Sequence, residues 1–88
     1  MIKETVKIKN KLGLHARAAS SLVQLTENFK SKITIEKDEQ YADGKSILGI
    51  LMLAAGLGTE LSLVVEGEDE KEAFLSIKKL IDDKFNEE

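Results

Sequence analysis

A chain of 88 residues that is 42% hydrophobic and 33% charged predicts a single globular domain over residues 1–88 rather than a disordered chain. It has no cysteine, which excludes disulfides, thiolate nucleophiles and cysteine-based zinc sites, and which fits a cytoplasmic location. A formal net charge of −3, few aromatic residues and the absence of any apolar run near the roughly 18 residues of a membrane span argue against nucleic-acid binding and membrane insertion.

The first half of the chain predicts three strands and one helix. Residues 2–9 alternate in part between polar and apolar side chains, as a half-buried strand does. A turn at residues 11–13 leads to a helix over about 16–29, which carries apolar side chains at helical spacing. Residues 32–36 alternate cleanly as a second strand, and a weaker third strand follows at about 40–42.

The second half predicts a short helix, a strand and a long helix. Ser46 is a natural N-cap for a helix over residues 47–53, and glycines follow that helix. Residues 60–66 form the fourth strand, and after Gly67 comes a helix with acids at its start and lysines later. Four one-sided strands and three helices in the order βαββαβα predict an α+β, two-layer sandwich, with helices covering one face of the sheet.

The only histidine, His15, stands in the turn where the first predicted helix begins. Free N–H groups and the positive end of the helix dipole make such a place receptive to anions. A neutral imidazole is nucleophilic near neutral pH, and a phosphoryl group on it would meet the N–H groups of Ala16 and Arg17. The alternative is an ordinary surface or capping histidine. The position of His15 favours a carrier of phosphoryl groups.

Arg17 strengthens this interpretation. A cation in the first turn of a helix opposes the helix dipole, and no acidic residue between positions 10 and 19 compensates for it. A guanidinium in that place is explained by an anion that arrives later and that it clamps through two hydrogen bonds, although a solvated arginine without a task is the alternative. One histidine offers no cluster of metal ligands, so we expect neither a metal site nor a cofactor.

The second candidate site is Ser46 with the helix that follows it. Ser46 is either only an N-cap or a phosphorylation site, because a phosphate is tolerated at a helix N-terminus, where Lys45 could pair with it. The helix over 47–53 is apolar on nearly every side. Either its neighbours bury it, or it is an exposed patch that docks partners. We favour the patch, with Leu48 and Met52 pointing outward.

Two segments carry a family resemblance: Gly13-Leu14-His15-Ala16-Arg17 and Lys45-Ser46-Ile47-Leu48-Gly49. They resemble the active-site and regulatory-serine segments of the HPr/NPr family, the histidine-containing phosphocarriers of the bacterial phosphoenolpyruvate-dependent phosphotransferase system. The resemblance extends over essentially the whole chain. It implies an open-faced β-sandwich in which three helices cover one face of a four-stranded antiparallel sheet.

The resemblance also implies roles. His15 would accept phosphate on Nδ1 from phosphorylated Enzyme I and pass it to IIA domains, and Arg17 would stabilise the phosphohistidine. The protein would be a stoichiometric carrier rather than an enzyme, acting as a monomer whose docking surface stays free. Ser46 would be the target of an HPr kinase/phosphorylase, and a transcriptional regulator would be a further partner. The expected docking residues are Leu14, Ile47, Leu48, Leu51 and Met52.

One departure and three alternatives accompany this resemblance. The family usually has proline after the arginine, whereas this chain has Ala18. Residues 9–13 and 51–55 also look like the nitrogen-related paralogue NPr, and the sequence does not choose between the sugar and nitrogen branches.

A different class of function is a regulatory binding module, in which phosphorylation of Ser46 controls docking and His15 is vestigial. A metabolite-binding domain or small hydrolase would need a paired acid and base, which the sequence lacks.

Overall fold

The order of elements along the chain is the predicted one. The computed structural model describes residues 1–87. Its elements are β1 (Ile2–Lys7), α1 (Ala16–Thr26), β2 (Lys32–Lys37), β3 (Gln40–Asp43), α2 (Ile47–Met52), β4 (Glu60–Glu66), α3 (Glu70–Asp82) and the 3₁₀ turn η1 (Lys84–Asn86). The four strands form one sheet in the order β1-β4-β2-β3, and every neighbouring pair is antiparallel.

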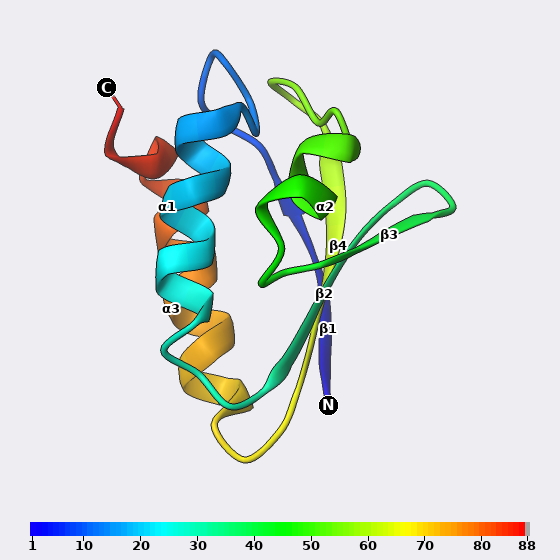
Figure 1. The fold of residues 1–88 in the computed structure, drawn as a ribbon, viewed down its shortest axis with the longest axis vertical. Helices are drawn as coiled ribbons and strands as arrows, with labels where there is room; N and C mark the ends of the chain where they lie inside the picture. The colour runs from blue at the N-terminus through cyan, green and yellow to red at the C-terminus, as the bar shows by residue number, and fades with distance from the viewer. Residues whose placement is uncertain (88) are drawn as a thin grey trace.

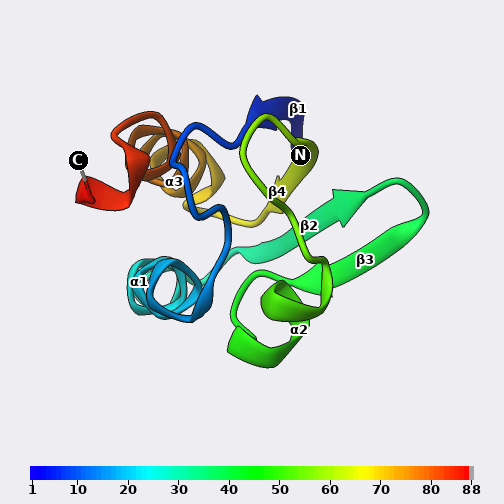
Figure 2. The same ribbon diagram turned by 90° about the horizontal axis from the view of Figure 1, so that it is seen from above.

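The three α-helices lie on one side of this sheet and leave its other face open (Figures 1 and 2). Strand alternation produces this arrangement, because successive side chains of a strand point to opposite faces. In β2, for example, Ile33 and Ile35 are buried while Lys32 is exposed. The strand side chains buried under the helices are Val6, Ile33, Ile35, Ala42, Leu61, Leu63 and Val65. The predicted open-faced, two-layer α+β sandwich is confirmed.

Three elements end earlier than predicted: α1, β1 and α2, the last of which ends at Met52 rather than at residue 53. The first helix stops at Thr26 rather than near Phe29. The N–H of Glu27 still bonds to the carbonyl of Val23, but the N–H groups of Asn28 and Phe29 bond to carbonyls three residues back in tighter turns. The buried Thr26 hydroxyl donates to the carbonyl of Gly44 at 2.8 Å and so ties the end of α1 to the turn before α2. β1 ends at Lys7. The next residue, the completely buried Ile8, still forms backbone hydrogen bonds with Gly58 and Thr59, in the loop before β4.

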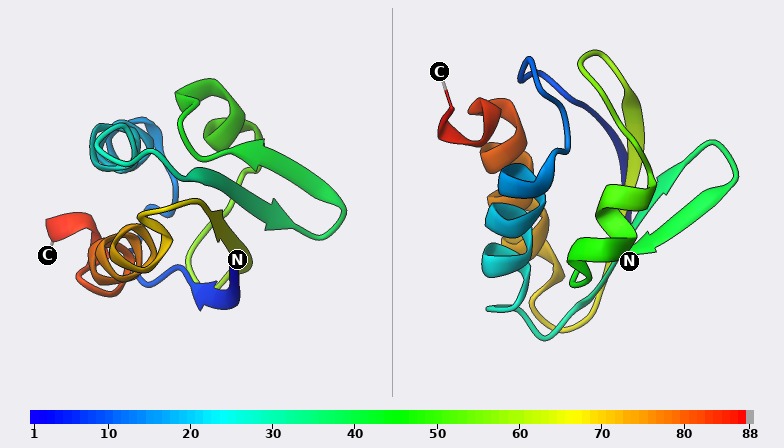
Figure 3. Two further views of the ribbon diagram at one scale, coloured as in Figure 1. Left: turned by 90° about the horizontal axis from the view of Figure 1, so that it is seen from below. Right: turned by 45° about the horizontal axis from the view of Figure 1, so that its top comes forward.

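The start of α3 is anchored to the loop between α1 and β2. Asp69 stands at the N-cap position, yet its carboxylate makes no capping hydrogen bond to α3. It accepts instead from the hydroxyl and the N–H of Ser31 at 2.5 and 3.0 Å and from the N–H of Lys30 at 2.8 Å. These hydrogen bonds join the start of α3 to the loop that follows α1. Figure 3 shows the two long helices side by side.

Within residues 1–87, none of the helices is both long and apolar enough to cross a membrane.

Candidate functional site

His15 is the N-cap residue of α1. Its backbone is extended (φ −77°, ψ 179°), and its carbonyl accepts the first helical hydrogen bond, from the N–H of Ala19 at 2.8 Å. The N–H groups of Ala16 and Arg17 therefore precede the hydrogen-bonded part of the helix. Both residues are exposed, so an anion can approach these N–H groups from solvent. The local geometry suits the anion-binding place that the sequence predicts.

The turn before His15 has a shape that glycine permits. Gly13 has φ +66°, and a Cβ atom on it would lie 2.4 Å from the carbonyl oxygen of Ala55. The amide of the buried Asn10 donates to the carbonyl of Gly13 at 2.8 Å, and the N–H of Leu14 donates to the carbonyl of Ala55 at 2.8 Å. The loop after α2 therefore supports the turn that presents His15.

The two ring nitrogens of His15 have different surroundings. Nε2 contacts the Oε2 atom of Glu87, whereas Nδ1 has no hydrogen-bond partner among the described residues. The other oxygen of Glu87 accepts from the amide of Asn10 at 3.0 Å. Burial raises the pKa of Glu87, but the hydrogen bonds from Asn10 and His15, together with the charge of Arg17, outweigh it and bring the pKa below its ordinary value. Glu87 is thus a carboxylate at neutral pH.

A pocket of about 390 Å³ opens beside the imidazole. Its lining residues are Lys11, Leu12, His15, Arg17 and Glu87. None of the ion pairs within residues 1–87 involves Arg17. Among the described residues, the pocket therefore places a guanidinium that forms no ion pair next to a potential nucleophile. That combination suits a doubly charged oxyanion such as a phosphoryl group.

The second candidate site begins at Ser46, which caps α2. Its hydroxyl accepts a hydrogen bond from the N–H of Gly49 at 3.0 Å, as an N-cap serine does. Leu48 and Met52 are 68% and 72% exposed, and Ile47 is exposed beside them. The expectation that α2 presents an apolar surface with Leu48 and Met52 outward is confirmed. We call Ile47, Leu48 and Met52 the α2 patch.

The chain matches the family model described as "PTS HPr component phosphorylation site" over residues 2–83. It belongs to the HPr/NPr phosphocarrier family. The phosphocarrier protein HPr of Treponema pallidum (strain Nichols) is 46% identical over 88 residues, which are all of both chains. The phosphocarrier protein NPr of Shewanella violacea is 44% identical over 86 residues, 98% of this chain and 94% of that protein. Names from both branches of the family thus occur among the relatives.

A solved structure supports the same assignment. HPr-C-His from Thermoanaerobacter tengcongensis has a TM-score of 0.96 and 45% identity to this chain, and the match covers 100% of this chain and 99% of that one. The family, the phosphotransferase system to which it belongs and the phosphocarrier fold are therefore established for this chain.

Two expected docking residues of this HPr/NPr protein do not lie in the α2 patch. The prediction was wrong for Leu14, which is only 5% exposed, because its N–H bonds to the loop after α2 and the turn directs its side chain into the core. Leu51 is half-buried and packs against the core. The exposed leucines are Leu12, in the turn before His15, and Leu57, in the loop after α2. The sequence did not indicate them, because an isolated leucine between polar and glycine residues carries no periodic signal.

Glu87 was also missed. No spacing in the sequence relates it to His15, because 71 intervening positions separate the two residues and only the return of the chain after α3 brings them together. A metal site is not indicated either: residues 1–87 contain no group of three or more histidine, cysteine, aspartate or glutamate side chains that could hold an ion.

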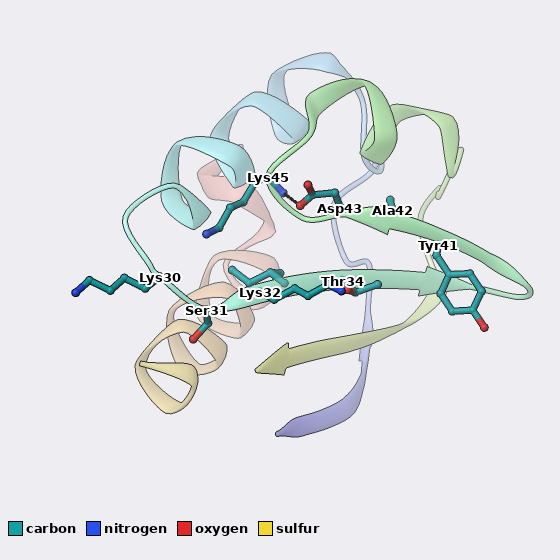
Figure 4. A pocket seen from close by; sticks show the side chains of 9 residues that line it. Lys30, Ser31, Lys32, Thr34, Tyr41, Ala42, Asp43 and Lys45 are labelled. Atoms are coloured by element: carbon teal, nitrogen blue, oxygen red, sulfur yellow. Dashed lines mark hydrogen bonds between the residues drawn. The ribbon is translucent and has the colours of Figure 1, made fainter. Parts of the chain in front are cut away.

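A second pocket, of about 410 Å³, lies between the start of β2 and the end of β3 (Figure 4). Lys30, Lys32 and Lys45 line it, so it has a cationic rim. The ammonium of Lys45 donates to the carbonyl of Phe29 at 2.7 Å, and Lys30 pairs with Glu68 at 3.4 Å. Two of the three lysines thus already have partners, and the ammonium of Lys45 is engaged by the carbonyl of Phe29.

Proposed function

We propose that His15 accepts a phosphoryl group on Nδ1 from phosphorylated Enzyme I and passes it to IIA domains of the phosphotransferase system. The observation that carries this proposal is the difference between the two ring nitrogens. Nε2 contacts Glu87, while Nδ1 has no hydrogen-bond partner within residues 1–87. Nδ1 is thus the nitrogen whose lone pair is available at the start of α1, where N–H groups and Arg17 favour an anion.

The transfer needs no other group of the protein to form a bond. The lone pair of Nδ1 attacks phosphorus, the N–P bond forms, and the donor's bond to phosphorus breaks with its electron pair staying on the donor. The proton on Nε2 remains on the ring throughout. In the second transfer the N–P bond breaks and its electron pair returns to Nδ1. The protein is then a stoichiometric carrier, whose contribution is positioning and electrostatic stabilisation.

The experiment is incubation with Enzyme I and phosphoenolpyruvate, followed by intact-mass measurement of the wild type and His15→Ala. One acid-labile phosphate on the wild type, absent from His15→Ala, supports the proposal. Arg17→Ala should keep the fold and slow the transfer about tenfold or more, because it removes one stabilising cation. If the folded wild type takes no phosphate from Enzyme I that is active on another carrier, the regulatory binding module becomes the better function.

We further propose that Ser46 is a regulatory phosphorylation site for an ATP-dependent HPr kinase/phosphorylase. Its hydroxyl lies at the start of α2 and next to the α2 patch. A phosphate there would place about two negative charges beside an apolar docking surface and would hinder Enzyme I. The same patch would serve IIA domains and a transcriptional regulator, since methionine and leucine side chains adapt to several partners.

A monomer fits this function, because a carrier that docks through the α2 patch must keep it uncovered. A structure of an HPr dimer from Thermoanaerobacter tengcongensis is known, so a dimer is the state to test against. Light scattering over a tenfold range of concentration decides between them: a constant mass of one chain supports the monomer, and a mass that doubles with concentration contradicts it.

A further inference from the structure

The chain reverses sharply after α3. Lys84, Phe85 and Asn86 have φ angles of 59°, 55° and 60°, a run of three residues with side chains in the left-handed region. Such a run is unfavourable for L-residues and persists only where the surrounding structure holds it. The buried Phe85 side chain packs into the core and supplies that hold. The reversal returns the C-terminal segment to the start of α1, as the red end of the ribbon shows in Figure 1.

The reversal delivers Glu87 to the His15 turn, where both of its carboxylate oxygens are engaged. Oε1 accepts from the amide of Asn10 at 3.0 Å, and Oε2 contacts Nε2 of His15. Asn10 is completely buried, and the same amide group holds the carbonyl of Gly13 at 2.8 Å. The carboxylate is therefore held by a fixed donor of the turn that presents the imidazole. Its side chain is only 12% exposed, so water competes weakly for these contacts.

We propose that Glu87 is a positioning residue that keeps the proton of the neutral imidazole on Nε2 and leaves the lone pair on Nδ1. A neutral imidazole has one nitrogen that donates and one that accepts, and an ionised carboxylate can only accept. Nε2 must therefore be the donor in this contact, and Nδ1 the acceptor. This role rests on the proposed function, since it matters only if Nδ1 attacks phosphorus.

The same contact acts after the transfer. Once Nδ1 carries the phosphoryl group and Nε2 keeps its proton, the ring bears a positive charge. The Glu87 carboxylate lies against that Nε2–H and compensates the charge, as carboxylates that orient histidines do. Electrostatic repulsion between Glu87 and an incoming phosphoryl donor is the opposing effect. The two effects predict opposite changes in rate when the charge of Glu87 is removed, so a charge-neutral variant separates them.

The first test is the tautomer of His15, read from ¹⁵N NMR of the imidazole at a pH where the ring is neutral. The variants are Glu87→Gln and, as a control with the same loss of charge, Glu72→Gln on the exposed side of α3. The wild type and the control should show the Nε2–H form. Glu87→Gln should show a mixture of both forms, because an amide can either donate or accept. This measurement needs no partner protein, so it stands apart from the proposed function.

The second test is the rate of phosphorylation by Enzyme I. Glu87→Gln should be about tenfold slower than the wild type, with Glu72→Gln unchanged, in line with the loss of a carboxylate that orients a histidine. An unchanged tautomer population in Glu87→Gln, or a rate equal to or above that of the wild type, overturns the proposal. If the wild type itself accepts no phosphate, the proposed function fails, and the tautomer measurement alone decides whether Glu87 orients the ring.

Discussion

The N–H of Leu14 donates to the carbonyl of Ala55 at 2.8 Å and joins the His15 turn to the loop that follows α2. The hydrogen bond requires close approach of two backbones, which Gly13 permits. Because of this contact, the turn that holds the candidate nucleophile is joined directly to the segment that follows the helix with the α2 patch. A partner docked on the α2 patch, as proposed above, would therefore also lie close to the His15 turn.

Gly13→Ala tests this junction. Alanine at this position would have to adopt the left-handed backbone conformation, and its methyl group would clash with the carbonyl of Ala55. The free energy of unfolding should therefore fall by about 1–3 kcal/mol from the backbone strain alone. Gly56→Ala is the matched control, because its added Cβ meets nothing within 4 Å and its φ is not positive. Urea unfolding of both variants provides the measurement, and equal losses in the two would refute the argument.

Leu48→Glu should weaken docking of Enzyme I without loss of fold stability, because Leu48 is exposed in the α2 patch. We expect the KM of Enzyme I for the carrier to rise about tenfold, the effect of losing a moderate contact at an interface. Leu75→Glu on α3 removes a leucine of similar exposure, 55%, outside the patch. Equal KM values for the two variants would show that α2 is not the docking helix.

Ser46→Asp and Ser46→Ala separate the two roles of Ser46. Aspartate can still accept from the N–H of Gly49, so stability should be kept while phosphorylation of His15 by Enzyme I slows. Alanine loses the cap and should lower the free energy of unfolding by about 1 kcal/mol, with transfer close to normal. Thermal unfolding and transfer kinetics are measured on both. Normal kinetics in Ser46→Asp would argue against regulation through charge at this position.

Ala18→Pro should be tolerated and should raise the free energy of unfolding by about 0.4–1 kcal/mol. Ala18 lies in the first turn of α1, and the first helical hydrogen bond is donated by the following residue, Ala19. Proline there removes an N–H that the helix does not use and restricts the unfolded chain. Urea unfolding measures the change. A loss of stability would mean that this completely buried position has no room for the ring.

The protein should lose stability as the pH falls below about 4. The hydrogen bonds from the Ser31 hydroxyl and then from the Lys30 N–H lower the pKa of Asp69 from its ordinary 3.8. Hydrogen bonds from Lys9 and Lys78 likewise lower the pKa of Asp82. A carboxyl with a lower pKa in the folded state stabilises the fold above its unfolded pKa and loses that effect as pH falls through the folded pKa.

Urea midpoints at pH 7 and pH 3 measure this effect. Asp69→Asn should lower the midpoint at pH 7 and reduce the difference between the two pH values, because the variant has no charge to lose at that position. Glu39→Gln, in the exposed turn between β2 and β3, should leave both midpoints near those of the wild type. A midpoint for Asp69→Asn that equals the wild type at pH 7 would mean that the Asp69 hydrogen bonds contribute little.

Local patterns in the amino-acid sequence predicted the order of the main elements and the two candidate sites. Alternation in residues 32–36 and 60–66 predicted strands that the structure contains, since every second side chain of a one-sided strand must leave water. Ser46 predicted the start of a helix, because the side chain of an N-cap residue accepts a hydrogen bond from an N–H group two or three residues later. His15 and Arg17 likewise indicated an anion-binding site through their position at the start of a helix. All these signals are local, so a single sequence carries them.

Which remote residues come into contact depends on tertiary packing. Leu14 looked like part of a docking surface, but the loop after α2 covers it. Glu87 gave no signal, and it reaches His15 only because a left-handed turn anchored by Phe85 returns the chain to the start of α1. Contacts of this kind depend on how remote elements pack and on where a chain reverses. Periodicity and capping describe a few neighbouring residues, and they carry no information about either.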